Sequence, residues 1–299
     1  MKGIVPVLNT PFTADDKIDL NAIRRNTELS IKAGVAGLLV PAMASEVYKL
    51  NPTERLSIVQ AVIEKVNGRI PVIGGAGETD SAQRQIIIKD LLKIGCENVL
   101  LQIPYENDEQ FYAEFNRAAQ LGPEMIMLQD FDSQGYGLGI DLVCKLFEEV
   151  PAFRCFKIEV VPAGIKYSQM LKATEQRLHI SGGWAVMQMI EAMERGVHAF
   201  ITTAMNDIYV RIYTLYYSGN SEEAQELFNQ LLPVLAFSNQ HLDISIHFFK
   251  RLLFKQGIYP TANVRQPILN FDRIHEKTAD ELIKKVIQMT TILREDKYE

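Results

Sequence analysis

The chain contains a short, mostly apolar run, RCFKIEV, at residues 154–160, with Lys157 at its centre. A run of this length and composition is typical of a strand buried in a parallel sheet. Lysine is almost never fully buried unless it is paired or has a chemical use. Three interpretations of Lys157 therefore stay open: an amine that forms a Schiff base with a carbonyl substrate, a strand-end lysine that reaches solvent, or an ion pair with Glu159.

Burial would give Lys157 the chemistry that the first interpretation needs. Loss of solvation disfavours the ammonium form, so the pKa of a lysine falls from about 10.4, by up to ~3–5 pH units when burial is complete. Alternation along the strand puts Cys155, Lys157 and Glu159 on one face. Glu159 is then positioned to shuttle protons, although its charge would raise the lysine's pKa. Its alternative role is structural, as a partner for Arg154 or for a loop amide.

Short apolar runs recur along the chain and alternate with segments of helical spacing. The predicted strands are Gly3–Leu8, Gly37–Ala42, Pro71–Ala76, Asn98–Pro104, Met125–Phe131, Arg154–Val160, Leu178–Gly182 and His198–Ala204. The predicted helices between them are Leu20–Ala33, Pro52–Val66, Ser81–Ile94, Glu109–Ala119, Asp141–Glu149, Tyr167–Thr174 and Ala185–Arg195. Eight strands in this alternation predict an α/β fold, the closed (β/α)8 TIM barrel.

A doubly wound open sheet is the alternative fold, but it should carry a glycine-rich phosphate fingerprint after its first strand. The turn there is Asn9-Thr10-Pro11-Phe12, with no such fingerprint. In a barrel, catalytic groups lie at the C-terminal ends of the strands. Lys157 stands late in the sixth strand, so the predicted barrel favours its chemical use.

The predicted domain organisation is a barrel over residues 1–220 and C-terminal helices over 221–299, within one structural domain. Helical spacing marks Ser221–Phe237, Gln240–Gln256 and Ala279–Leu293. The second of these segments carries apolar residues that look exposed, namely Phe248, Phe249, Leu252, Leu253 and Phe254. We expect these helices to pack on the barrel or on a neighbouring subunit.

Composition bounds the possible partners. The chain has 299 residues, 47% of them hydrophobic, and a net charge of −6, which disfavours nucleic acid and anionic membranes as partners. No apolar stretch approaches the length of a membrane span. Three widely separated cysteines, Cys96, Cys144 and Cys155, have no metal-ligand spacing and suggest buried thiols in a reducing compartment, so we expect a cytoplasmic protein without a metal site.

Seven further pieces of sequence stand in a characteristic order. They are Thr10-Pro11-Phe12 with Ile18-Asp19, Ala33-Gly34-Val35-Ala36-Gly37-Leu38, Glu46 with Leu50, Thr53-Glu54-Arg55, Gly68-Arg69-Ile70-Pro71-Val72-Ile73-Gly74-Gly75, Pro104-Tyr105 and Val264-Arg265-Gln266-Pro267. Together the pieces resemble the dihydrodipicolinate synthase / N-acetylneuraminate lyase superfamily from Gly3 to about Asp272. The resemblance puts Lys157 at the family's Schiff-base lysine. It implies a small-molecule substrate, pyruvate or another 2-keto acid, no metal or organic cofactor, and a homotetramer or homodimer.

The chain departs from the family's pattern at several site positions. The family's Gly-Thr-Thr-Gly-Glu stretch is Ala42-Met43-Ala44-Ser45-Glu46, in which the Ser45 hydroxyl and the amides of Ala44 and Ser45 remain to hold a carboxylate. Gln129 stands where the family has a proton-transferring tyrosine, and an amide cannot act as a general acid or base. Gln134 stands where synthases have an arginine that grips the second substrate. This loss argues against aspartate semialdehyde as the partner.

The expected function is therefore a lyase, aldolase or dehydratase on a different 2-keto acid. The candidate groups for proton movement are Glu159, Tyr105, Tyr136 and a water held by Gln129. The expected binding residues are Ala44, Ser45, Ser133, Gln134, Gly182 and Thr202. The loops after the fourth and fifth strands and the segment from Lys157 to Tyr167 would set the aldehyde half, and they contain polar groups suited to hydroxyls, such as Asn107, Asp108 and Lys166. Two alternatives stay open: a true synthase with an unusual proton relay, and a weak or inactive binder of 2-keto acids. A phosphate site at Ser181-Gly182-Gly183 is disfavoured, because a lone Gly-Gly is a weak signal.

Overall fold

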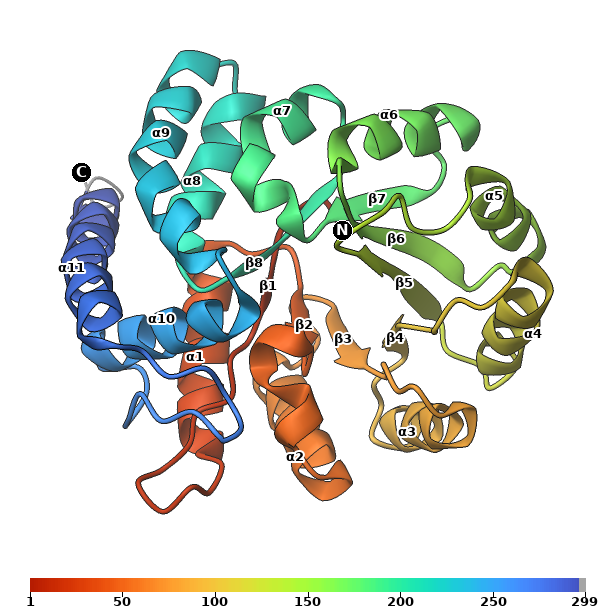
Figure 1. Ribbon diagram of the computed structural model, residues 1–299, viewed down its shortest axis with the longest axis horizontal. Helices are drawn as coiled ribbons and strands as arrows, with labels where there is room; N and C mark the ends of the chain where they lie inside the picture. Colours follow the sequence, from red (N-terminus) through yellow and green to blue (C-terminus); the bar gives the residue numbers. More distant parts are fainter. Residues whose placement is uncertain (296–299) are drawn as a thin grey trace. The chain divides into compact units, whose positions relative to one another are not determined.

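Eight parallel strands form a closed barrel in the order β1 to β8 in the computed structural model, which describes residues 1–295 without the side chains of residues 184 and 185. The strands are β1 (Gly3–Val7), β2 (Leu38–Val40), β3 (Val72–Gly75), β4 (Asn98–Leu101), β5 (Met125–Asp132), β6 (Phe153–Val160), β7 (His179–Gly182) and β8 (Ala199–Thr203). Figure 1 shows the alternation of strands and helices along the chain. The predicted TIM barrel is thus confirmed.

The helices follow the strands in turn. They are α1 (Leu20–Ala33), α2 (Pro52–Val66), α3 (Ser81–Lys93), α4 (Asp108–Ala119), α5 (Ile140–Glu149), α6 (Ala163–Ala173), α7 (Met189–Glu194), α8 (Asn206–Tyr217), α9 (Ser221–Ser238), α10 (Leu242–Lys255) and α11 (Arg273–Glu295), with short 3-10 turns η1 (Met43–Ser45), η2 (Val47–Lys49) and η3 (Trp184–Gln188). Within residues 1–295, no helix is long and apolar enough to cross a membrane.

The chain forms two compact units. The first comprises Met1–Lys2 and Pro71–Ile201, and its strands β4 to β7 pair in parallel. Helices α5 and α6 pack on the outer side of β6 (Figure 1). The side chains of β6 are buried on both faces apart from Arg154, as expected for a strand between the barrel interior and a layer of helices. This double burial is what encloses Lys157.

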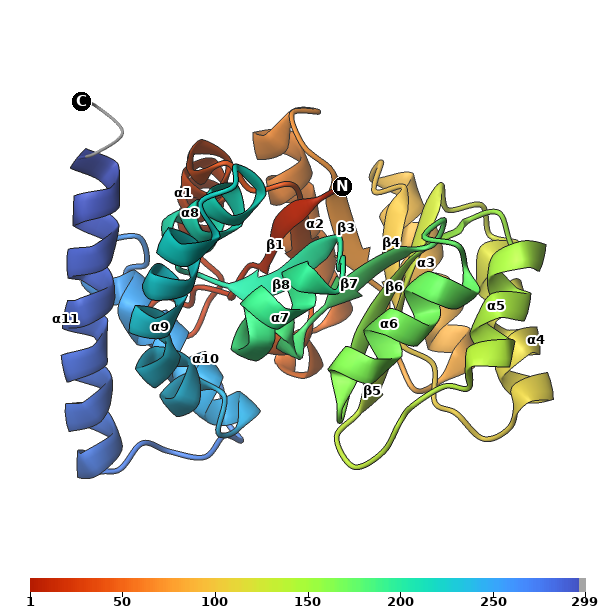
Figure 2. The ribbon, with the colours of Figure 1, turned by 90° about the horizontal axis from the view of Figure 1, so that it is seen from above.

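The second unit comprises Gly3–Ile70 and Thr202–Glu299. Its α11 runs along α8, α9 and α10 (Figure 2). Four of the five apolar side chains predicted to look exposed on α10 are buried, and only Phe254 is open to solvent, at 42% exposure. The physical reason is that α10 packs against η1, α9 and α11, which together cover most of its surface. The predicted boundary at residue 220 stays a prediction.

Four helices depart from the sequence-based prediction. Helix α7 covers only Met189–Glu194 after the turn η3, where one helix over Ala185–Arg195 was predicted, and α11 begins at Arg273 rather than Ala279. Helix α8 was not predicted, because its IYVRIYTLYY run is rich in β-branched and aromatic residues that prefer strands. Helix α6 begins at Ala163 rather than Tyr167, because Pro162 serves as its N-cap and Gly164 is accommodated inside its first turn. The start of α2 agrees with the prediction: Asn51 caps it, and Glu54 returns the bond to the Asn51 amide.

Candidate active site

Lys157 lies at the centre of a compact buried cluster in the first unit. The strand register places it beside Gln129 on β5 and Ser181 on β7. Its Nζ lies 2.5 Å from Glu159 Oε2, and the Gln129 amide donates to the same oxygen. Lys157 is 4% exposed and Glu159 is 9% exposed. The lysine therefore does not reach solvent, and the ion pair with Glu159 that the sequence left open is present.

Glu159 has no contact with Arg154 that would give it the structural role considered above. The Arg154 guanidinium instead donates to Glu124, at 3.4 Å. The Glu159 carboxylate faces the lysine amine from the same face of β6, as alternation predicts. An amine and a carboxylate in hydrogen-bond contact away from solvent can exchange a proton directly, which is the geometry that general acid–base chemistry requires.

The loop after β5 is fixed by a buried lysine. Lys166 Nζ, which is fully buried, donates to Asp130 Oδ2 at 2.5 Å and to the carbonyl oxygens of Tyr136 and Leu138 at 2.5 and 2.7 Å. Burial raises the pKa of Asp130 and lowers the pKa of Lys166, against their mutual attraction. All three donors of the Lys166 ammonium are therefore engaged within the protein, and none is left for a substrate hydroxyl in this arrangement.

Replacing Lys166 with methionine should lower the free energy of unfolding by about 3–5 kcal/mol, because it leaves the Asp130 carboxylate buried without its counter-charge. Chemical denaturation monitored by circular dichroism measures this loss. The matched control is Lys172→Met, since Lys172 lies on the same helix with its side chain exposed. Equal stability of the two variants would contradict the structural role of Lys166.

The other predicted residues of this unit lie outside the lysine cluster. Ser133 and Gln134 are exposed on the loop after β5, where Asp132 accepts the Gln134 amide. Tyr105 is 55% exposed, and its hydroxyl donates to Asp108 at 2.9 Å, a bond that raises the pKa of the tyrosine. Gly182 is buried at the end of β7, opposite Ile158. Roles for these residues stay predictions.

Two further expectations for the first unit concern Asn107 and Tyr136. The Asn107 side chain caps α4 by accepting the Gln110 amide. The Tyr136 hydroxyl donates to Gln169. Both groups therefore hold local structure in this conformation.

In the second unit, the predicted carboxylate-binding turn is held both by internal hydrogen bonds and by hydrogen bonds to the residues that follow β1. The Ser45 hydroxyl donates to Leu8 O at 2.6 Å, and the Ser45 amide donates to Ala42 O at 2.8 Å. The carbonyl of Ala44 accepts the Asn9 side-chain amide at 2.7 Å. Both donors of Ser45 are engaged, so a carboxylate would have to share or displace one of these bonds.

Among the buried polar atoms of the second unit that have no hydrogen-bond partner within residues 1–295, two lie on or just after a barrel strand. They are Thr202 Oγ1, which the sequence indicated, and Asn9 Oδ1, which it did not. Buried polar atoms without partners are unusual in folded proteins, so each needs a reason. Asn9 could have been recognised in the sequence, because it is a polar residue immediately after the first predicted strand.

Several of the sequence pieces that carry the family resemblance meet in one network around Glu46, in the second unit. Its carboxylate accepts Lys250 at 2.6 Å and the Arg265 amide at 2.9 Å, and Arg265 in turn binds Glu54 with both terminal nitrogens. Phe12 lies beneath the Lys250 ammonium and the Arg265 guanidinium. Burial lowers the pKa of Lys250 to about 8. These pieces therefore hold the fold of this unit.

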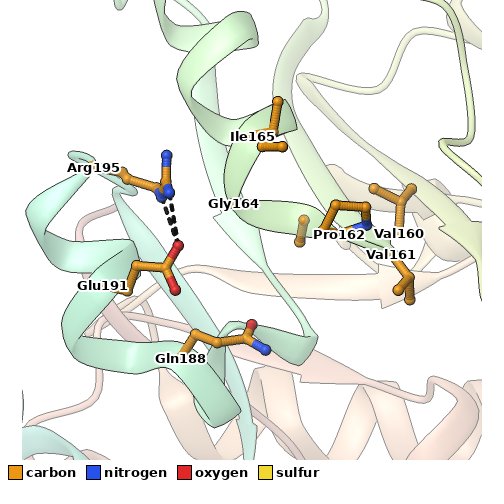
Figure 3. Close-up of a pocket in the computed structure, with 9 residues that line it drawn as sticks. Val160, Val161, Pro162, Gly164, Ile165, Gln188, Glu191 and Arg195 are labelled. Carbon is orange, nitrogen blue, oxygen red and sulfur yellow. Dashed lines mark hydrogen bonds and ion pairs between the residues drawn. The ribbon is translucent and has the colours of Figure 1, made fainter.

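A pocket of about 250 Å³ lies beyond the end of β6 (Figure 3). Its described lining comes from the residues that follow Glu159 and from η3 and α7, and it includes the ion pair of Glu191 with Arg195. Lys157, Glu159 and Gln129 do not line it. The lysine cluster and this pocket are therefore separate features of the first unit.

The closed barrel, with a buried lysine and its carboxylate on the sixth strand, defines the protein as a (β/α)8 barrel. The chain belongs to the dihydrodipicolinate synthetase family, whose model matches residues 1–286. This is a family of Schiff-base lyases and dehydratases.

Two relatives illustrate the similarity in sequence. The 4-hydroxy-tetrahydrodipicolinate synthase of Methanopyrus kandleri is 27% identical over 240 residues, covering 78% of this chain and 80% of its own. The L-2-keto-3-deoxyarabonate dehydratase of Azospirillum brasilense is 25% identical over 296 residues, covering 94% of this chain and 92% of its own.

One solved structure illustrates the similarity in fold. A prophage protein of the dihydrodipicolinic acid synthase family from E. coli K12, in complex with pyruvate, gives a TM-score of 0.87 at 19% identity and covers 96% of this chain and 98% of its own. At this identity the likeness shows the fold.

Proposed function

We propose that the protein is a Schiff-base lyase or dehydratase that acts on a 2-keto acid through an imine on Lys157. The observation that carries the proposal is the 2.5 Å contact between Lys157 Nζ and Glu159 Oε2 in buried surroundings. A lysine that attacks a carbonyl must first lose a proton, and here a carboxylate lies in contact to receive it. Glu159 thereby accepts and donates protons, a role that the amide of Gln129 cannot fill.

In the proposed reaction, Glu159 first takes a proton from the Lys157 ammonium. This transfer turns the buried ion pair into a neutral amine and a carboxylic acid. The amine attacks C2 of the keto acid. Glu159 receives the protons that the nitrogen loses and donates protons to the former ketone oxygen, which leaves as water. The product of these steps is a protonated imine, which serves as the electron sink.

The imine supports two outcomes for a 2-keto-3-deoxy acid. Loss of a C3 proton to Glu159 gives an enamine, and the enamine expels the C4 hydroxyl as water once that group is protonated. Alternatively, loss of the C4 hydroxyl proton breaks the C3–C4 bond and gives an aldehyde and the enamine of pyruvate. After cleavage, the enamine of pyruvate takes up a proton at C3 and becomes an imine. In both cases hydrolysis of the final imine releases the product and restores Lys157.

A 2-keto-3-deoxy sugar acid is the substrate class that we propose. The likeness to the Azospirillum dehydratase, which covers 94% of the chain against 78% for the Methanopyrus synthase, supports this class. Gln134 also supports it, since a neutral, exposed amide there offers no positive charge for a second carboxylate.

The test is turnover of a panel of 2-keto-3-deoxy sugar acids, followed by detection of pyruvate and of the dehydrated keto acid. We expect one product from at least one member of the panel, and no loss of activity after treatment with a chelator. Condensation of pyruvate with aspartate semialdehyde would favour a true synthase instead. Imine formation without any turnover would favour an inactive binder of 2-keto acids.

We further propose that the protein works as a homotetramer or homodimer in the cytoplasm. Large apolar side chains of the second unit that are open to solvent, including Phe254, Leu269 and Ile274, support association. Sedimentation or light scattering at micromolar concentration tests this assembly, and a monomer under these conditions would contradict it.

A further inference from the structure

Gly183 has a conformation that does not explain why it is glycine. Its backbone angles, φ −80° and ψ −49°, lie in the region open to every L-amino acid. A side chain there would nevertheless meet Glu159. A Cβ built on Gly183 would lie 2.6 Å from Glu159 Cγ and closer still to its Cδ and Oε1. Glycine is therefore required at position 183 because it has no side chain to fill this space.

The Glu159 carboxylate fills that space and is held from its other side. One of its oxygens, Oε2, accepts Lys157 from β6 and the Gln129 amide from β5. The other oxygen, Oε1, lies over Gly183. The Gly183 backbone is itself fixed, because its amide donates to Ile158 O at 3.4 Å and the preceding Gly182 pairs with Ile158.

These contacts leave the carboxylate little freedom. Gly183 and Glu159 are fixed by neighbouring strand ends, so a methyl group at position 183 cannot be avoided by a small backbone adjustment. The flexible part is the Glu159 side chain, which would have to turn away. Turning away would break its contacts with Lys157 and Gln129.

We propose that Gly183 is a positioning residue, which keeps the Glu159 carboxylate against the Lys157 amine by leaving the space that this carboxylate occupies. This inference rests on the proposed function, in which Glu159 moves protons to and from Lys157. Proton transfer falls steeply when donor and acceptor separate, and a misplacement of about 1 Å costs roughly 10²-fold in rate.

The experiment compares Gly183→Ala with Gly139→Ala. Gly139 also has ordinary backbone angles, and a Cβ there would meet no atom within 4 Å. The readout is the rate of borohydride-trapped imine formation with pyruvate, measured as a function of pH. We expect Gly183→Ala to slow trapping about 10²-fold and to move the pH profile to that of Glu159→Ala, whereas Gly139→Ala should retain the wild-type rate and profile.

A double-mutant cycle separates positioning from simple structural damage. In the Glu159→Ala background the three atoms nearest to a Cβ at position 183 are gone, so adding Gly183→Ala should lower neither the trapping rate nor the melting temperature. An equal loss in both backgrounds, or a wild-type rate and pH profile in Gly183→Ala alone, would overturn the inference. Absence of trapping in the wild type would instead contradict the proposed function. The same double-mutant cycle, measured by melting temperature instead of trapping rate, would still test the contact between residues 159 and 183.

Discussion

Replacing Lys157 with alanine should abolish imine trapping and lower turnover by on the order of 10⁴-fold or more, since the variant loses the nucleophile itself. The amine is the only part of the proposed site that bonds covalently to the substrate. Binding residues that remain cannot supply the electron sink that the imine provides. Turnover of the best substrate in the keto-acid panel measures the effect.

Lys172→Ala is the matched control for this variant, because it removes an exposed lysine from α6 and should leave turnover unchanged. The folding of Lys157→Ala is checked by its circular dichroism spectrum, since the variant also leaves Glu159 without its buried partner. A folded Lys157→Ala protein with wild-type turnover would refute the assignment of this lysine.

Replacing Glu159 with glutamine should reduce turnover by about 10²–10⁴-fold, the usual contribution of a positioned acid or base. The change preserves size and hydrogen bonding but removes the group that can exchange a proton with Lys157. Imine formation should become slow without being lost, because the Lys157 amine, the nucleophile, is still present. Stopped-flow or quenched trapping with borohydride resolves this rate from turnover.

Glu97→Gln provides the corresponding control, since Glu97 is exposed and immediately precedes β4. Its rates should match those of the wild type. If Glu159→Gln also matched the wild type, proton transfer would have to be assigned to another group, and Tyr105 or Tyr136 would return as candidates.

Much of the barrel could be predicted from the sequence, because each buried parallel strand is a short apolar run set between helical periods. The predicted ends of the strands differ from the observed ends by only a few residues. β4, for example, ends at Leu101 rather than Pro104, since the chain leaves the sheet before the proline. Helix α8 was missed because its residues individually favour strands, and its contacts with α9 and α11 override that preference.

The candidate site was predictable where one strand determines the geometry. Lys157 and Glu159 share a face of β6, so their contact follows from alternation alone. The roles of Lys166 and Gly183 depend on contacts between elements far apart in sequence. The sequence showed Lys166 only as a polar group suited to substrate hydroxyls, because nothing local indicates that its ammonium binds Asp130 and the loop after β5. Gly183 showed only as part of a Gly-Gly pair.

The most direct test of the central claim is to reduce the protein with borohydride in the presence of pyruvate and to map the modified peptide by mass spectrometry. We expect one major modification, with the mass of a reduced pyruvate adduct, on the peptide that contains Lys157. We also expect no label in Lys157→Ala. A label on Lys166 or Lys250 instead, or pyruvate-releasing turnover without any label, would contradict an imine on Lys157.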